Sequence, residues 1–248
     1  MADSAQSRRV VLVTGAARRI GAVIARRLHA AGYDVALHAR RSQSELDALV
    51  AELEGARASS TLALEADLGN VAALPDLANA VVERFGRLDA LVNNAAAFYP
   101  TPVGSATPAQ WDELFGTNAR APFFLAQAAA PHLAASNGAI VNIVDIYAEQ
   151  PLAAHPIYSM SKAALAAMTK ALARDLAPDV RVNGVAPGAI LWPDGGKSET
   201  AQQALIERTP LKRMGSPDDI ASAVLWLLEA PFVTGEIVRV DGGRHLVT

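Results

Sequence analysis

The sequence predicts an α/β fold in which one doubly wound sheet of about seven parallel strands carries helices on both faces. Two observations lead to this fold class. Short apolar runs alternate with helical stretches along all 248 residues. The runs are continuously apolar, which is typical of strands that crossover helices bury on both faces. No linker, internal repeat or low-complexity tract interrupts the pattern, so we expect one domain spanning residues 1–248.

The expected strands are the apolar runs at 10–15, 33–40, 61–67, 88–96, 138–145, 179–187 and 235–243. Apolar residues at helical spacing predict helices at 20–31, 44–55, 71–86 and 155–176. Pro75 falls within the third of these helices. It must lie in the first turn or kink the helix, because proline has no backbone N–H to donate.

Composition limits the class of function. The chain is 51 % hydrophobic and has a formal net charge of −3, so no global charge attracts nucleic acid or anionic lipid. Cysteine is absent and the five histidines show no tight ligand spacing, so neither disulfides nor a metal site are expected. The N-terminus is polar, and no apolar run approaches the roughly 18 residues of a membrane span. These features predict a cytoplasmic protein without a membrane partner.

The least regular part of the sequence is 187–203, which is rich in Gly, Pro and polar residues and follows the sixth strand. Segments after the carboxyl end of a strand commonly border the ligand in such sheets. We therefore expect a substrate lid at about 188–214. The alternative is a long loop without such a role, although long irregular loops are uncommon without a function.

The turn "VTGAARRIG" joins the first strand to the first helix. Gly15 permits a tight turn and Gly21 permits close helix–sheet packing, while the free N–H groups of the helix N-terminus attract a pyrophosphate. Two glycines alone are a weak signal, because any such connection can use them. Arg18 and Arg19 strengthen it by placing positive charge within the turn. The alternative for both arginines is solvated surface charge.

The second strand ends in "HARRS". In dinucleotide-binding folds an acid at this point binds the ribose hydroxyls of NAD, whereas an arginine accommodates the 2′-phosphate of NADP. Arg40, Arg41 and Ser42 offer two guanidinium groups and a hydroxyl, so we expect NADP(H) as the cofactor. Asp67 ends the third strand and is placed to receive the adenine amino group. It can also be the N-cap of the following helix.

Two further motifs carry the chemistry. "NNAA" (Asn93 to Ala96) follows the fourth strand, and "YSMSK" places Tyr158 and Lys162 at positions i and i+4 of one helix face. Together with the glycine turn, Asn118 in a central helix and the Pro187–Gly188 pair, they make the chain resemble the short-chain dehydrogenase/reductase family over nearly its full length. The combination is specific, although each motif alone is not. The resemblance implies a Rossmann-type domain.

The resemblance also implies roles. Tyr158 would protonate the atom left negative by hydride addition, Lys162 would hold the nicotinamide ribose and lower the pKa of Tyr158, and Asn118 would support a water-linked proton route. An ammonium about 5 Å away contributes roughly 3 kcal/mol at an effective dielectric of about 20. That would lower a tyrosine pKa from about 10 by roughly two units. The alternative is that Tyr158 and Lys162 form a solvated helix pair.

Asp145 departs from the family pattern, which has a serine here that donates to a carbonyl oxygen. An ionised carboxylate cannot donate, and it would repel a growing alkoxide and raise the pKa of Tyr158. A carboxyl group suits a substrate that presents nitrogen, because N–H groups need acceptors and a C=N nitrogen needs a proton. Asp145 therefore predicts imine reduction. The alternative is that Asp145 only caps the next segment.

Three departures together resemble the pteridine reductases and the similar dihydromonapterin or dihydrofolate reductases of this family. Arg19 stands at the middle glycine of the TGxxxGxG pattern, Asp145 at the serine, and Phe98 and Tyr99 follow the NNA motif. The resemblance implies that Phe98 stacks on a pterin and that Arg19 reaches both cofactor phosphate and pterin. The alternative for Phe98 is core packing. Ala96 stands where the subgroup often has serine, which leaves the pterin orientation and the choice of substrate open.

The predicted function is NADPH-dependent reduction of a C=N bond in a pterin or folate-like small molecule. The predicted catalytic residues are Asp145, Tyr158, Lys162 and Asn118, and the predicted substrate contacts are Arg19, Phe98, Asp145 and Tyr158. The predicted cofactor contacts are Gly15, Arg18, Arg19, Ile20, Gly21, Arg40, Arg41, Ser42, Asp67, Leu68, Asn94, Ala95, Tyr158, Lys162, Pro187 and Gly188.

Two other functions stay open. One is an NADPH-dependent carbonyl or 3-oxoacyl-thioester reductase of the same family, in which Asp145 is tolerated. The other is a non-catalytic NADP(H) sensor, which degenerate catalytic residues would mark. The resemblance further implies a homotetramer built through the long central helices and the C-terminal strand region. The alanine-rich helices fit close helix approach, or simply packing on the sheet.

Overall fold

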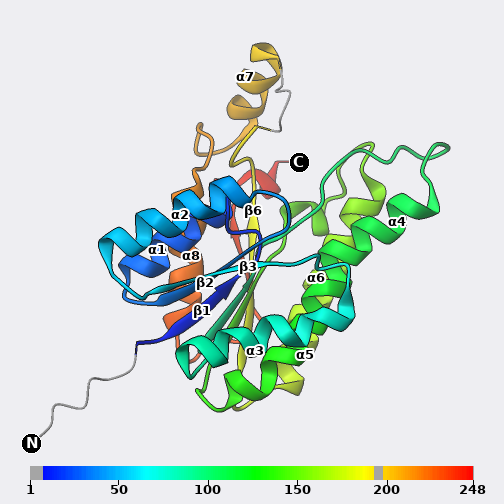
Figure 1. The fold of residues 1–248 in the computed structure, drawn as a ribbon. Helices are drawn as coiled ribbons and strands as arrows, with labels where there is room; N and C mark the ends of the chain where they lie inside the picture. Colours follow the sequence, from blue (N-terminus) through cyan, green and yellow to red (C-terminus); the bar gives the residue numbers. More distant parts are fainter. Residues whose placement is uncertain (1–7, 193–197, 248) are drawn as a thin grey trace, which may run out of the picture.

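The computed structural model describes residues 8–192 and 198–247. Within this part of the chain the strands form one parallel sheet of seven strands, in the order β3-β2-β1-β4-β5-β6-β7 (Figure 1). The predicted α/β class and the parallel sheet are thus confirmed. The strands are β1 (Val10–Val13), β2 (Asp34–Ala39), β3 (Thr61–Glu65), β4 (Ala90–Asn93), β5 (Ala139–Ile143), β6 (Arg181–Pro187) and β7 (Ile237–Val240).

Helices cover both faces of the sheet, as Figure 1 shows. One layer holds α1 (Arg19–Ala30), α2 (Gln43–Ala56) and α8 (Pro217–Glu229), and the other holds α3 (Leu74–Phe85), α5 (Ala121–Ala134) and α6 (Pro156–Asp175). In β1, Val11 and Val13 belong to the first core, whereas Val10 and Leu12 belong to the second. Because side chains alternate across a strand, a strand buried on both faces must be apolar throughout.

Several helices differ from the sequence prediction. α3 begins at Leu74 with Pro75 in its first turn, so this proline is accommodated at the helix start. α7 (Glu199–Arg208) begins inside the segment expected to be irregular, and the Ser198 hydroxyl caps it by accepting from the N–H of Ala201. α8 was not predicted, although Ser216 and Asp219 form a capping box at its start. Residues 193–197 of the predicted lid lie outside the described residues.

The sheet has its switch point between β1 and β4. From β1 the chain continues to β2 and β3 on one side, and then returns to β4 on the other side. Open α/β sheets bind ligands at this point, outside the carboxyl ends of the strands. Here Asn94 joins the two strand ends, because its side-chain amide donates to the carbonyls of Thr14 (2.8 Å) and Gly15 (3.0 Å).

Candidate active site

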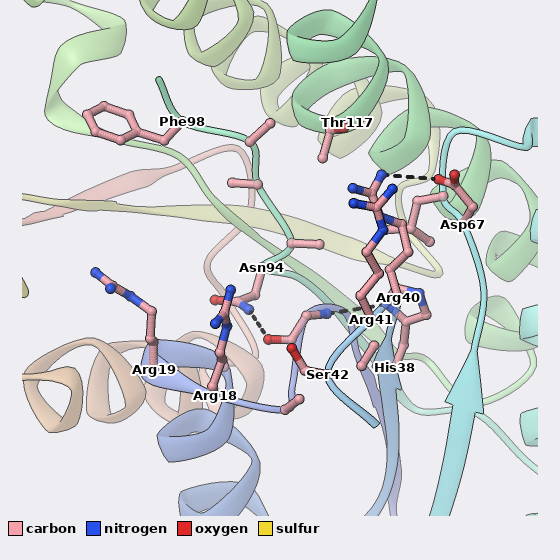
Figure 2. A pocket seen from close by; sticks show the side chains of 18 of the residues that line it. Arg18, Arg19, His38, Arg40, Arg41, Ser42, Asp67, Asn94, Phe98 and Thr117 are labelled. Carbon is pink, nitrogen blue, oxygen red and sulfur yellow. Dashed lines mark hydrogen bonds and ion pairs between the residues drawn. The ribbon is translucent and has the colours of Figure 1, made fainter. Parts of the chain in front are cut away.

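A cavity of about 580 Å³ lies at this switch point, outside the carboxyl ends of β1, β2, β3 and β4. Figure 2 shows the arginines that follow β1 and β2 pointing into it, with Phe98 at the end away from Asp67. The cavity brings together most of the predicted cofactor residues and two predicted substrate contacts, Arg19 and Phe98. These are Gly15, Arg18, Arg19, Ile20, Gly21, Arg40, Arg41, Ser42, Asp67, Leu68, Asn94, Ala95 and Phe98.

The turn after β1 requires both of its glycines. Gly15 has φ +62, and a Cβ on it would lie 3.0 Å from the Cα of Ala95. A Cβ on Gly21 would lie 2.1 Å from the carbonyl oxygen of Gly15. The turn is therefore closed by backbone contacts that leave no room for side chains, and it leads directly into the N-terminus of α1. This cradle fits a pyrophosphate group, which backbone N–H groups and the helix dipole favour.

Arg19 connects the glycine turn to the predicted lid. It starts α1 with φ +55, a conformation that is uncommon for a residue with a side chain. Its guanidinium Nη2 donates to the carbonyl oxygen of Trp192, 3.1 Å away. Arg18 precedes it, lines the same cavity and is exposed. Arg19 thus lies between the turn and the segment that follows β6, where contact with both a cofactor and a substrate is possible.

The far end of the cavity carries the residues predicted for the adenosine part of a cofactor. Arg40, Arg41 and Ser42 line it together. Arg40 lies 3.6 Å from a carboxylate oxygen of Asp67, and this pair is half-exposed. Asp67 is not a helix N-cap, because its carboxylate accepts from the N–H of Gly69 and the next helical turn is preceded by Asn70. The alternative prediction, that Asp67 is the N-cap of the following helix, was therefore wrong.

Asp145 and Tyr158 form a hydrogen-bonded pair. The Tyr158 hydroxyl donates to Oδ2 of Asp145 at 2.7 Å, while Oδ1 of the same carboxyl accepts from the N–H of Tyr147 at 2.9 Å. Asp145 thus caps the short helix η3 (Ile146–Ala148) and contacts the predicted proton donor at the same time. The alternative that it only caps the next segment does not describe this geometry.

Burial dominates the protonation of this pair. It raises the pKa of the Asp145 carboxyl above its ordinary value, although the bond from the Tyr147 N–H opposes the shift. It also raises the pKa of Tyr158 well above its ordinary value, and the neighbouring Asp145 adds to the increase. The expected decrease in the Tyr158 pKa is not seen. Desolvation penalises the tyrosinate, and the carboxylate beside it disfavours a second negative charge.

Lys162 lies next to this pair, on the face of α6 that also carries Tyr158. Its ammonium donates to the carbonyl oxygen of Ile143 at 2.8 Å and lies 5.9 Å from the centroid of the Tyr158 ring. Burial lowers the pKa of Lys162 to about 8, although Asp145 acts in the opposite direction. Tyr158 and Lys162 are both buried, so they are not a solvated surface pair.

Asn118 fixes the segment that leads to Phe98. It lies in η2 (Gly116–Arg120), a π-helical turn between α4 (Pro108–Phe115) and α5. Such turns often mark functional sites. The Asn118 carbonyl oxygen accepts from the N–H of Ala97, and its amide donates to the Ala97 carbonyl and to the Ser161 hydroxyl. Since both amide hydrogens are engaged, the side chain anchors Ala97 to α6.

Phe98 forms one wall beside the Asp145–Tyr158 pair. Its ring is 46 % exposed, which argues against core packing. It meets the Tyr158 ring edge to face at a centroid distance of 4.8 Å, and His155 stacks against it at 4.9 Å. The N–H of Thr101 donates to the carbonyl of Ala154, so the Phe98 loop and the loop before α6 are joined. The structure thus presents an aromatic surface next to the predicted proton donor.

Some predicted contacts do not line the cavity. The predicted cofactor contacts Tyr158, Lys162, Pro187 and Gly188 are absent from its lining, and so is the predicted substrate contact Asp145. Gly188 instead packs against the C-terminal segment, since a Cβ on it would lie 2.6 Å from the Cβ of Asp241.

The cavity also has lining residues that sequence reasoning missed, chiefly His38, Tyr99, Glu113 and Thr117. Tyr99 donates to Glu113 at 2.9 Å, and burial with this carboxylate raises the pKa of Tyr99 to about 12. Position alone could have indicated His38, because it lies two residues before the arginines that follow β2. Glu113 and Thr117 reach the cavity from α4 and η2, which no local motif predicted.

The sequence matches a known protein family over most of its length. Residues 15–245 match the family described as "Enoyl-(Acyl carrier protein) reductase". Together with the relatives that follow, this match shows that the chain belongs to the short-chain dehydrogenase/reductase family. It is therefore an oxidoreductase of a family that uses a nicotinamide cofactor.

The relatives carry two kinds of name. The chain is 39 % identical to "Granaticin polyketide synthase putative ketoacyl reductase 2" of Streptomyces violaceoruber, over 100 % of both chains. It is 37 % identical to "Pteridine reductase 1" of Leishmania tarentolae, over 96 % of each chain. It is 33 % identical to a 3-oxoacyl-(acyl-carrier-protein) reductase of Staphylococcus epidermidis, over 95 % of this chain and 98 % of that protein. The family resemblance is confirmed, and so is a likeness to pteridine reductases.

Two features are absent from the part of the chain that the structure describes. No group of three or more His, Cys, Asp or Glu side chains is arranged to hold a metal ion there. No helix in the same residues is both long and apolar enough to cross a membrane.

Proposed function

We propose that this protein reduces a C=N bond of a pterin or folate-like substrate with NADPH. The observation that carries the proposal is the 2.7 Å hydrogen bond between the Tyr158 hydroxyl and the Asp145 carboxyl. A negative group beside the proton donor disfavours a substrate that develops an alkoxide. It favours a substrate whose nitrogen atoms donate hydrogen bonds and then take up a proton.

In the resting pair the carboxylate of Asp145 accepts from the Tyr158 hydroxyl. Burial raises the pKa of Asp145, so this carboxylate can take up a proton after Tyr158 has given its own to the substrate. Asp145 and Tyr158 can then act as one proton-delivery unit. When bound, the reduced nicotinamide cofactor supplies a hydride to the carbon of the C=N bond. The Tyr158 hydroxyl gives its proton to the nitrogen, and a proton held at Asp145 restores the hydroxyl. A positioned donor of this kind typically contributes about 100- to 10,000-fold.

The Phe98 ring supports a flat heteroaromatic substrate. It is half-exposed, and it lies edge to face with Tyr158. Stacked aromatic rings gain about 0.5–1.5 kcal/mol beyond their buried area. A bicycle lying on Phe98 would present its edge to Asp145 and Tyr158, which are the donors and acceptors that a pterin edge needs.

Arg40, Arg41 and Ser42 support NADP(H) as the cofactor. They line the cavity together, and Asp67, the acid closest to them among the cavity residues, is paired with Arg40. Guanidinium groups bind phosphate through two parallel hydrogen bonds. Gly15, Arg18 and Gly21 would hold the pyrophosphate, and Lys162 would hold the nicotinamide ribose.

The second candidate is a carbonyl or 3-oxoacyl-thioester reductase. Relatives with ketoacyl and oxoacyl reductase names match this chain at 39 % and 33 % identity, on either side of the 37 % for the pteridine reductase. Ala96, where the pteridine reductase subgroup often has serine, fits this candidate too. A sensor without turnover is less well supported, because Asn118, Tyr158 and Lys162 are all present.

The test is NADPH oxidation by the purified protein with dihydropterins, dihydrofolate, a 3-oxoacyl thioester and simple ketones. We expect turnover with a dihydropterin or dihydrofolate and a much lower kcat/KM with the carbonyl compounds. Turnover of the 3-oxoacyl thioester alone would support the second candidate.

The remaining expectations are proposals of the same kind. We propose a single domain over residues 1–248 with a substrate lid at about 188–214, assembled as a homotetramer in the cytoplasm. The bond from Arg19 to Trp192 supports the lid, because it ties this segment to the cofactor turn. Light scattering coupled to gel filtration tests the tetramer.

A further inference from the structure

His38 joins the strand ends that make up the adenosine side of the cavity. It is buried near the end of β2, with 2 % of its surface exposed. The N–H of Gly15 donates to its Nδ1 at 3.3 Å, and its Nε2 lies 3.1 Å from the carbonyl oxygen of Ala66. A carbonyl can only accept, so Nε2 carries the hydrogen and Nδ1 is left as the acceptor. This geometry requires the neutral imidazole.

Both hydrogen-bond partners of His38 belong to the proposed cofactor site or adjoin it. Gly15 opens the turn that fits the pyrophosphate, and Ala66 immediately precedes Asp67. His38 itself is two residues before Arg40, and its own carbonyl accepts from the N–H of Ala16 at 2.8 Å. Figure 2 shows the His38 ring below Arg40 and Arg41, with the bond from Gly15 drawn to it. One buried ring therefore sets the spacing of β1, β2 and β3 where they meet the cavity.

We propose that neutral His38 is a positioning residue for the cofactor, and that its protonation releases the Gly15 turn and weakens binding. The reason is geometric. A proton on Nδ1 would point at the Gly15 N–H, so an attractive contact would become a contact between two donors. The turn would move away from His38 and the end of β2, and the pyrophosphate cradle would lose its shape. This inference needs only the nicotinamide cofactor of the family and does not depend on the identity of the substrate.

Burial and the charges around His38 determine the pH at which its ring takes up a proton. Burial lowers its pKa below the ordinary value, whereas the Asp67 carboxylate acts in the opposite direction. The other charged groups on the adjoining segments are Glu65, which ends the neighbouring strand β3, and Arg18, Arg40 and Arg41, which line the cavity. Because burial lowers the pKa of His38 below its ordinary value, the neutral ring is the form present at neutral pH. We therefore expect the loss of affinity on the acid side.

The test measures the Kd of NADPH between pH 8 and pH 5 in the wild type, His38→Asn and His38→Val. Asparagine keeps an acceptor near Nδ1 but does not titrate, whereas valine removes the acceptor. We expect His38→Val to bind about 3- to 10-fold more weakly at pH 7.5, the effect of one lost hydrogen bond, and His38→Asn to bind about two- to threefold more weakly. On acidification, the wild type should lose more affinity than His38→Asn.

The 2′-phosphate also titrates, with a pKa of about 6, but it does so equally for every variant. His132→Asn is the matched control, because it removes a histidine of α5 outside the cavity and should follow the wild-type pH profile. Parallel pH profiles for the wild type and His38→Asn would overturn the proposal, and so would wild-type affinity in His38→Val. If His38→Val does not fold, the comparison of pH profiles still decides.

Discussion

At the scale of single residues, the two oxygens of Asp145 do different things. One accepts from the Tyr147 N–H and orders the chain after β5, and the other accepts from Tyr158. A serine at this position could make the second contact or donate to a substrate oxygen, but it could not hold a proton for transfer. The difference between a carboxyl and a hydroxyl at one position is therefore the basis for the choice between C=N and C=O substrates.

Phe98→Ala tests the stacking wall. We expect the KM for a dihydropterin to rise about 5- to 10-fold, which corresponds to about 1–1.4 kcal/mol of lost stacking. The melting temperature should change by no more than a few degrees, because the ring is already 46 % exposed. Steady-state kinetics and thermal unfolding measure the two effects.

Phe123→Ala is the matched control for Phe98, since it removes another exposed phenylalanine, on α5. Its kinetics should match those of the wild type. A large loss of stability in Phe98→Ala without a change in KM would instead indicate core packing, for which a truncated phenylalanine typically costs about 3–5 kcal/mol.

Arg41→Asp tests the choice of cofactor. Losing a charged hydrogen bond to the 2′-phosphate should lower kcat/KM for NADPH by about 1.5–3 kcal/mol, or roughly 10- to 150-fold. The value for NADH should change little, because NADH has no phosphate there. Arg84→Asp, on the exposed side of α3, is the control. Equal kcat/KM for NADPH and NADH in the wild type would contradict the proposed preference.

At the scale of secondary structure, buried polar contacts hold α6 against the sheet. The Asn93 side chain of β4 donates to Asn142 of β5, and Asn142 donates to Thr169 of α6, both at 2.9 Å. All three residues are buried. Buried hydrogen-bonded networks of this kind are costly to disturb. They fix the position of the helix that carries Tyr158 and Lys162.

The position of α6 also sets the pH dependence of activity. Because burial lowers the pKa of Lys162 to about 8, the free enzyme loses this positive charge as the pH rises through that value. We expect kcat/KM to fall above about pH 8, approaching about tenfold per pH unit. Lys170→Met removes an exposed lysine of the same helix and should keep the profile. An unchanged kcat/KM up to pH 10 would contradict the role of Lys162.

The same shift has the opposite sign for stability. Between about pH 8 and the unfolded value of about 10.4, the unfolded chain binds the extra proton, so a rising pH stabilises the fold through this group. Urea unfolding of the wild type and Lys162→Met over this range measures the effect, which should be absent from the variant.

At the scale of the whole molecule, the sequence predicted the sheet well and the connections less well. Runs such as 10–13 are apolar on both faces, so their burial in a parallel sheet follows from the pattern alone. α7 was missed because its polar, weakly amphipathic sequence follows a Gly- and Pro-rich stretch. The local signal for this helix is its N-cap, Ser198, whose hydroxyl accepts from the N–H of Ala201.

In the candidate active site, too, local sequence patterns predicted some residues and missed others. Residues within local motifs, such as Gly15 and Tyr158, were predicted because turn geometry and helix spacing are local. Glu113 was missed because its place at the cavity depends on contacts between distant segments. His38 was missed although its position two residues before Arg40 was a local signal. The direction of the Tyr158 pKa was also wrong. The sequence indicated Lys162 as a neighbour but not how completely Tyr158 is buried.

The substrate of the whole enzyme depends on the side chain at position 145, and Asp145→Ser is the variant that tests this dependence. The measurement is the ratio of kcat/KM for a dihydropterin to that for a 3-oxoacyl thioester, in the wild type, Asp145→Asn and Asp145→Ser. Asn keeps an acceptor for the Tyr147 N–H and therefore separates loss of the cap from loss of the proton. We expect the wild-type ratio to favour the dihydropterin strongly. Both variants should lose about 100- to 10,000-fold in pterin reduction, and the serine variant should shift the ratio toward the thioester. Full pterin activity in Asp145→Ser, or a wild type that prefers the thioester, would contradict the proposed reduction of a C=N bond.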